Sequence, residues 1–313
     1  MNNAVDLSVI SSKPDSAAFV DVCNLSFSYG DDLVLENVCL TVEGSGKIIG
    51  IFGPNGGGKT TFLKCLLGLL KPVSGSVRLF GLEPKNARKY VGYIPQVSKF
   101  DFDFPINVLQ VVLMGRLSST GLFKRYSKKD YEIAEDCLKK VGIWDLRDRQ
   151  IGQLSGGQRQ RAFIARALAT KPKLLLMDEP NTGLDAFMQA DLYKLLKELK
   201  KEMAIILVSH DMGAIFHHVD DLACLRRTIH FHDPKTLSRP DFLKEFGCSV
   251  DQAIISLTNH TEIQNSHVHA HSHSNAHVQS NSNAHVNFNS HSENSKNQNQ
   301  ECSCETICEE VCK

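Results

Sequence analysis

The sequence predicts an α/β domain whose sheet is covered on both faces. Three runs are almost continuously apolar, as strands buried on both faces are: residues 47–52, 173–177 and 204–209. Stretches with helical periodicity alternate with these runs, which is typical of layered α/β folds. A glycine-rich segment separates the first run from the helical pattern that follows it.

Composition restricts the class of protein. The chain has 313 residues, of which 42% are hydrophobic and 22% charged, as in a soluble globular protein. Its 35 Lys and Arg balance 35 Asp and Glu, so no basic field would attract nucleic acid, and we expect no nucleic-acid partner. No run reaches the roughly 18–20 apolar residues of a membrane-spanning helix, and residues 1–15 do not resemble a secretory signal. We therefore expect neither an integral membrane protein nor a secreted one.

The chain is expected to have three parts. Residues 1–18 are small and polar, which predicts a flexible leader. Residues 19–246 have the texture of a folded domain, and a stretch at about 108–149 has helical character. Within that stretch, apolar residues recur at helical spacing: Ile133, Ala134, Cys137, Leu138 and Val141. Residues 247–313 pass into sequence dominated by His, Asn, Ser and Gln, which predicts a disordered tail.

The glycine-rich segment matches the phosphate-binding pattern G-x-x-x-x-G-K-[ST]. It follows the strand at 47–52 and opens a predicted helix at 59–70. Glycines allow backbone N–H groups to surround phosphate oxygens, and the helix N-terminus adds its positive end. The lysine would reach the outer phosphates, and the threonine hydroxyl would bind Mg²⁺. The predicted nucleotide ligands here are Gly53, Pro54, Asn55, Gly56, Gly57, Gly58, Lys59, Thr60 and Thr61.

Two carboxylates follow the strand at 173–177. Asp178 at the end of this strand could hold Mg²⁺ directly or through water. Glu179 beside it could orient and deprotonate a water that attacks the γ-phosphate.

A second anion site is predicted at the start of a helix near 159–169. Ser155 and Gln158 fit a capping box, so a helix should begin here. Gly156 and Gly157 leave its first N–H groups uncovered, and such a helix start favours anions.

In this order and spacing, the motifs resemble the ATP-binding cassette (ABC) family. The series is the phosphate loop, Gln96, the segment at 154–158, the strand with Asp178 and Glu179, Asp185 in 182–185, and His210 after the strand at 204–209. The resemblance covers about residues 20–239, and six ordered motifs make it highly specific. It implies a P-loop NTPase core with an antiparallel β subdomain and a helical subdomain inserted at about 97–153.

The resemblance also implies roles. Tyr29 would stack on adenine, and Gln96 would sense Mg²⁺ and the attacking water. His210 would contact the γ-phosphate and hold the water beside Glu179. ATP would lie in a head-to-tail homodimer, between the phosphate loop of one subunit and Ser155–Gln158 of the other, with Asp185 reaching across the interface.

A transport function is favoured over a soluble one. The chain carries one phosphate loop and no sustained heptads, unlike cassettes of translation and DNA repair. We expect two integral membrane permease subunits and an extracytoplasmic metal-binding protein as partners, with the chain peripheral at the cytoplasmic face of the membrane. Residues 96–116 resemble cassettes for zinc, manganese or iron uptake. An importer of an iron chelate or cobalamin, a metal exporter, and a soluble cassette ATPase remain alternatives.

The tail offers soft metal ligands. Alternating imidazoles and spaced thiolates can bind zinc, nickel or copper, and the residues concerned are His267, His269, His271, His273, Cys302, Cys304, Cys308 and Cys312. The alternative is a solvated tail that binds metal incidentally. The other cysteines are expected to be reduced: Cys23, Cys39, Cys65, Cys137, Cys224 and Cys248.

Overall fold

The computed structural model describes residues 18–96, 104–121 and 124–232. The chain divides into two units, Met1–Leu257 and Thr258–Lys313, and every described element belongs to the first. The predicted leader, apart from its last residue, and the predicted tail with its eight metal ligands lie outside the described residues.

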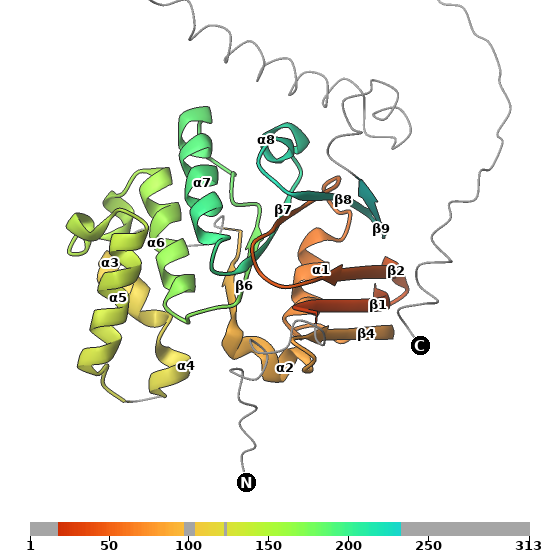
Figure 1. The fold of residues 1–313 in the computed structure, drawn as a ribbon, viewed down its shortest axis with the longest axis horizontal. Coiled ribbons are helices and arrows are strands. Elements are labelled where there is room, and N and C mark those ends of the chain that lie inside the picture. Colours follow the sequence, from red (N-terminus) through yellow and green to blue (C-terminus); the bar gives the residue numbers. More distant parts are fainter. Residues whose placement is uncertain (1–17, 97–103, 122–123, 233–313) are drawn as a thin grey trace, which may run out of the picture. The chain divides into compact units, whose positions relative to one another are not determined.

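A six-stranded sheet forms the centre of the domain (Figure 1). Its order is β5-β6-β7-β3-β8-β9, and all neighbours are parallel except β8 and β9. The strands are β3 (Ile48–Phe52), β5 (Val91–Ile94), β6 (Leu174–Asp178), β7 (Ala204–Ser209), β8 (Asp221–Arg226) and β9 (Thr228–His232). Every residue of β3, β6 and β7 is buried, as the apolar runs predicted. The predicted α/β class is therefore confirmed.

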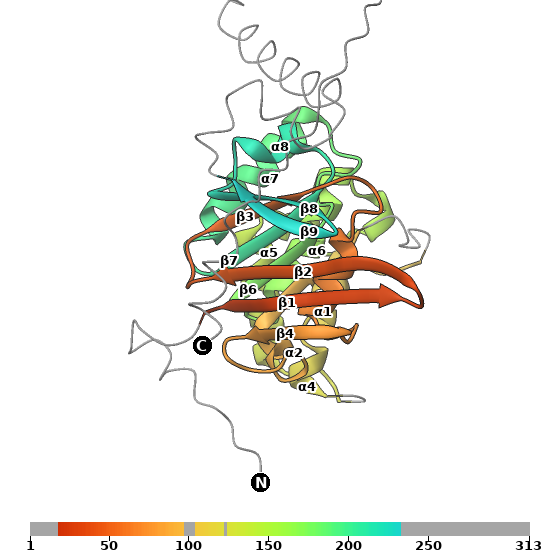
Figure 2. The ribbon, with the colours of Figure 1, turned by 90° about the vertical axis from the view of Figure 1, so that its right-hand side faces the viewer.

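A second sheet is antiparallel, in the order β2-β1-β4 (Figure 2). It consists of β1 (Val20–Tyr29), β2 (Asp32–Val42) and β4 (Ser74–Leu79). Its inner face and α1 (Lys59–Leu66) share one hydrophobic cluster with alternate residues of β3, β6 and β7. Helix α1 is thereby fixed against both sheets.

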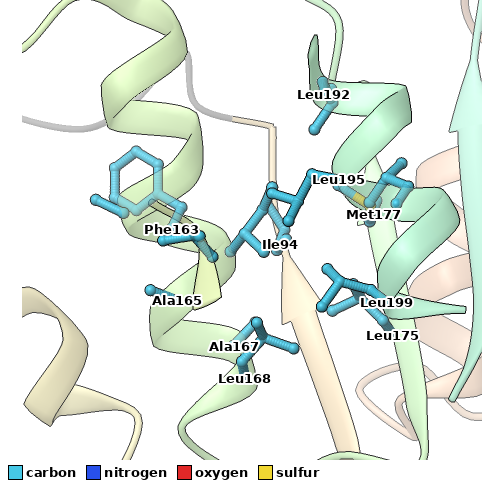
Figure 3. Packing of buried hydrophobic residues seen from close by; sticks show 14 of the residues in the cluster. Ile94, Phe163, Ala165, Ala167, Leu168, Leu175, Met177, Leu192, Leu195 and Leu199 are labelled. Atoms are coloured by element: carbon cyan, nitrogen blue, oxygen red, sulfur yellow. The ribbon is translucent and has the colours of Figure 1, made fainter. Parts of the chain in front are cut away.

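Helices between β5 and β6 form the second part of the core. They are α3 (Val108–Met114), α4 (Leu117–Thr120), α5 (Lys128–Lys140) and α6 (Gly156–Leu168), with 3-10 turns at Trp144–Leu146 and Ile151–Gln153. Ile133, Ala134, Cys137 and Leu138 form the buried face of α5, as predicted. Figure 3 shows Ile94 of β5 between α6, which carries Phe163, and α7 (Ala186–Leu199), which carries Leu195. The remaining short helices are α2 (Pro84–Ala87), a 3-10 turn at Arg88–Tyr90, and α8 (Met212–Phe216).

The predicted end of the first helix was wrong. The apolar pattern predicted a helix to residue 70, whereas α1 ends at Leu66. Gly68 adopts a left-handed conformation with φ 61°, and its N–H donates to Cys65 O. The N–H of Leu69 returns to Lys64 O, so these bonds close the helix at its C-terminus.

The described cysteines differ in burial and in bonding. Cys65 and Cys137 are buried free thiols, and burial raises the pKa of each to about 11. Cys39 Sγ donates a hydrogen bond to Asn24 Oδ1. Cys23 is disulfide-bonded, so the prediction of a reduced side chain was wrong there. The prediction assumed burial, but Cys23 lies on the less buried face of β1.

No helix within the described ranges has the length and apolar character needed to cross a bilayer.

A buried ion pair joins three helices of the helical part. Arg116 Nε lies 2.9 Å from Asp130 Oδ1, and Arg116 Nη1 donates to Ala169 O at the end of α6. Asp130 also accepts from the hydroxyl and the N–H of Ser127, which caps α5. These Ser127 bonds, followed by Arg116, lower the pKa of Asp130 to about 2. The pair therefore fixes the ends of α3 and α6 to the start of α5.

Replacing Asp130 by Asn is expected to lower the free energy of unfolding by about 2 kcal/mol at pH 7, because a charged hydrogen-bond acceptor is lost. A carboxylate with a lowered pKa stabilises the fold above its unfolded-state pKa, near 3.9, and this stabilisation is lost as the pH falls toward 2. Urea unfolding at pH 7 and pH 3 should show the difference between the two proteins shrinking at the lower pH. Asp136→Asn, an exposed change on the same helix, is the control, and an equal effect there would contradict the assignment.

Candidate nucleotide-binding site

The phosphate loop joins β3 to α1 and has little room for side chains. Gly56 and Gly58 have φ values of 79° and 94°, which favour glycine. A Cβ on Gly53 would lie 2.1 Å from Leu225 O of β8. A Cβ on Gly57 would lie 3.0 Å from the same oxygen and from Pro54 O. The loop is therefore held against β8, and its shape depends on backbone that only glycine allows to approach.

Lys59 lies at the start of α1 and folds back over its own loop. Its side chain is buried, and Nζ donates to Gly53 O at 2.8 Å and to Pro54 O at 3.0 Å. The same atom lies 3.5 Å from Glu179 Oε1. A buried ammonium so close to a buried carboxylate is paired, as a charge in such a place must be.

Thr60 and Asp178 meet beside the loop. Thr60 Oγ1 donates to Asp178 Oδ1 at 3.2 Å. Burial, which outweighs the Thr60 hydrogen bond, raises the pKa of Asp178. Burial and the neighbouring Asp178 raise the pKa of Tyr93, on β5, to about 12. A hydroxyl and a carboxylate placed together are hard oxygen donors, so these two residues fit a Mg²⁺ ion.

Glu179 is buried and has an unusual backbone. Its φ is 50°, a left-handed value that is costly for a side chain of this type. Its N–H donates to Val208 O at 2.9 Å, which continues the ladder between β6 and β7. Its Oε2 lies 2.6 Å from Nδ1 of His210, the first residue after β7, and accepts from the His210 N–H at 3.3 Å. The ends of two adjacent strands thus place a carboxylate and an imidazole in direct contact.

The start of α6 is a separate helix N-terminus. Ser155 Oγ accepts from Gln158 N, and Gln158 Oε1 accepts from Ser155 N, so the predicted capping box is confirmed. A Cβ on Gly157 would lie 3.3 Å from Met188, and one on Gly156 would lie 3.5 Å from Leu184. The first turn of α6 therefore rests on the segment that begins α7.

Asp185 caps α7. Its Oδ1 accepts from Met188 N at 2.8 Å, and the residue is exposed. Tyr29 is 49% exposed at the end of β1, with its ring edge-to-face against Phe27 at 4.8 Å. Gln96 is exposed two residues beyond β5.

Of the predicted residues, the structure brings five together in two neighbouring sets of contacts: Glu179 contacts Lys59 and His210, and Thr60 contacts Asp178. It places Tyr29, Gln96, Asp185 and Ser155–Gln158 on other elements, at or just beyond the ends of strands and helices; Gly156, Gly157 and Gln158 are half-buried and the others exposed.

Sequence reasoning missed two residues beside the site. Asn181 is buried, and its Nδ2 donates to Tyr193 Oη on α7 at 2.6 Å. The one available signal was Asn181 itself, a polar residue two positions after Glu179. Nothing in the sequence shows that its amide would point inward.

Comparison with known proteins agrees with this geometry. The family model described as "ABC transporter" matches residues 35–182. The manganese transport system ATP-binding protein MntB of Bacillus subtilis is 45% identical over 202 residues, which are 64% of this chain and 80% of that protein. The zinc uptake system ATP-binding protein ZurA of Listeria innocua is 41% identical over 217 residues, 68% of this chain and 84% of that protein. The solved structure of CbiO1 from Clostridium perfringens, part of the ABC transporter complex CbiONQ, has a TM-score of 0.64 at 26% identity, covering 81% of this chain and 99% of that one.

The fold and the site together define an ATP-binding cassette with a P-loop NTPase core. The chain belongs to the ABC transporter family, and its relatives include ATP-binding subunits of metal transport systems. Membership of this family implies that the chain binds ATP.

Replacing Gly53 by Ala is expected to weaken ATP binding at least about tenfold, because the added methyl group would force the loop away from Leu225 O. Titration with a fluorescent ATP analogue measures the affinity. Gly44→Ala is the control: it has a φ of 69° and open space, so it should cost about 1–2 kcal/mol of backbone strain and leave affinity unchanged. Normal affinity in Gly53→Ala would show that the close approach to β8 is unimportant for the loop.

Proposed function

We propose that this chain hydrolyses ATP to drive an ABC transporter that imports a divalent metal ion, manganese or zinc. The observation that carries the ATPase proposal is the meeting of Lys59, Thr60, Asp178, Glu179 and His210 at one edge of the sheet. The cargo proposal is supported by the names of relatives at 39–45% identity, which are manganese and zinc transport ATP-binding proteins.

Binding of ATP would rearrange Lys59. The triphosphate would lie in the loop between Gly53 and Thr60, at the N-terminus of α1. Lys59 Nζ now donates to two loop carbonyls, and phosphate oxygens would become its partners instead. Thr60 Oγ1 and Asp178 would hold Mg²⁺, which supplies charge neutralisation at the outer phosphates when bound.

Glu179 is the proposed general base. Its carboxylate would accept a proton from a water molecule while the water oxygen bonds to the γ-phosphorus and the bond to the bridging β–γ oxygen breaks. The contact between Glu179 Oε2 and His210 Nδ1 orients both groups. The other ring nitrogen of His210 would then face the γ-phosphate. Gln96, two residues beyond β5, would sense Mg²⁺ and the attacking water.

A second copy of the chain would complete the site. The turn at Ser155–Gln158 rests on the start of α7 rather than on the phosphate loop of its own chain. This separation supports a head-to-tail homodimer, in which the turn of one subunit covers ATP on the other. Asp185, exposed at the start of α7, would lie at that interface, and Tyr29 would stack on the adenine.

Membrane subunits would carry the cargo. ABC transporter ATP-binding subunits act with membrane permeases, and we propose two permease subunits and an extracytoplasmic metal-binding protein for this chain. Phe104, Met114 and Leu117 expose 58%, 40% and 48% of their surfaces in and beside α3 and α4. An exposed apolar surface on the helical part supports docking of a permease there and a peripheral position at the cytoplasmic face of the membrane.

Glu179→Gln is expected to keep ATP binding but to lower kcat by about 10²–10⁴-fold, because the amide cannot accept the proton. Steady-state hydrolysis and nucleotide titration measure the two effects. Glu198→Gln, near the exposed end of α7, is the control and should retain full turnover. Hydrolysis near the wild-type rate in Glu179→Gln would refute the assignment of the base.

The cargo can be identified in cells. A strain that carries Glu179→Gln, grown in metal-poor medium, is expected to contain selectively less manganese or less zinc than the native strain. Mass spectrometry of total manganese, zinc, iron, nickel and cobalt measures this, with a Glu198→Gln strain as the control. A selective rise in one metal would indicate export, and unchanged levels of all five would contradict metal transport.

A further inference from the structure

Asn181 is buried in a way that costs stability. The residue is only 7% exposed, and its Nδ2 donates to Tyr193 Oη at 2.6 Å. Its Oδ1 is also buried and has no hydrogen-bond partner among the described residues. A leucine has the same branching as asparagine and would carry no unpaired carbonyl oxygen here. The amide therefore needs an explanation other than packing.

The position of Asn181 in the chain indicates why an amide is buried there. It lies two residues after Glu179, whose left-handed φ of 50° is stable only if the surrounding structure holds it. Before Glu179, the backbone is fixed by the bond from its N–H to Val208 O. After Glu179, the turn closes through Thr182 N to Glu179 O and Leu184 N to Asn181 O. Gln189 Nε2 donates to Leu184 O where the turn enters α7, and the side chain of Asn181 attaches the turn to Tyr193 in the middle of that helix.

Tyr193 is a rigid attachment point. It is 1% exposed in the middle of α7, within the core cluster. Its ring also stacks on the ring of His218, at a centroid distance of 4.2 Å and an interplanar angle of 18°. His218 follows α8, in the same connection between β7 and β8 that begins with His210. The segments that follow Glu179 and His210 thus both contact one buried tyrosine.

We propose that Asn181 and Tyr193 are positioning residues that hold Glu179 in its left-handed conformation and so align its carboxylate with His210 for hydrolysis. This inference rests on the proposed role of Glu179 as general base. According to this proposal, the Asn181–Tyr193 hydrogen bond raises the kcat of ATP hydrolysis in addition to stabilising the fold.

The test uses Asn181→Leu, Tyr193→Phe and the double variant in the full-length chain. Each single change leaves a buried polar group unpaired, so the thermal midpoint should fall, and it should fall further in Tyr193→Phe because the whole amide of Asn181 then lacks its partner. The double variant removes both partners and should regain the wild-type midpoint. All three should lose about ten- to a hundredfold in kcat, with KM for ATP little changed, because Glu179 is displaced while the phosphate loop is intact.

The double variant separates the two explanations. A double variant with both stability and kcat restored would show that the pair serves folding alone, and would overturn the proposal. Tyr131→Phe, the same change at an exposed position on α5, is the matched control and should leave kcat and the midpoint unchanged. Measurements on Glu179→Gln keep the two proposals distinct. If that variant is inactive and Asn181→Leu turns over normally, only the positioning role fails.

Discussion

The site depends on the parallel pairing of β6 with β7. In this register Asp178 lies opposite Val208, and the ladder continues one residue further through the bond from Glu179 N to Val208 O. That last bond fixes where Glu179 leaves the sheet, and His210 leaves β7 two residues after Val208. A shift of one residue in this pairing would separate the carboxylate from the imidazole and would also move Asp178 away from Thr60. The apolar composition of both strands is therefore a requirement of the chemistry as well as of the core.

Local signals in the sequence predicted much of this arrangement. Unbroken apolar runs predicted the buried parallel strands, because a strand with both faces of its sheet covered needs apolar side chains at successive positions. The phosphate loop and the Ser155–Gln158 cap were predictable because they are local. Their glycines shape the backbone, and the side chains of Lys59 and Ser155 bond to backbone groups only a few residues away. The sequence predicted that both motifs serve one nucleotide, and the structure adds the contacts of Lys59 with Glu179 and of Thr60 with Asp178.

Other features depend on contacts between distant residues, and the sequence could not show them. The apolar pattern through residue 70 hid the end of α1, since Gly68 looks tolerable in a helix until its φ is known. The inward amide of Asn181 depends on Tyr193, twelve residues away on α7. The left-handed φ of Glu179 reflects the turn that follows it and has no signature in residue type. Such positions follow from the completed fold rather than from local preference.

The close approach of Gly53 to Leu225 has a consequence for the order of synthesis. The phosphate loop lies near the N-terminus, but the strands on either side of β3 are β7 and β8, which begin at Ala204 and Asp221. Until those strands have left the ribosome, β3 has no neighbour in its sheet, and the loop has no strand behind it. The nascent chain must therefore carry an apolar strand with two unpaired edges while the residues between β3 and β7 are synthesised, and such edges invite aggregation. We therefore expect ATP to bind only once β7 and β8 have paired with β3.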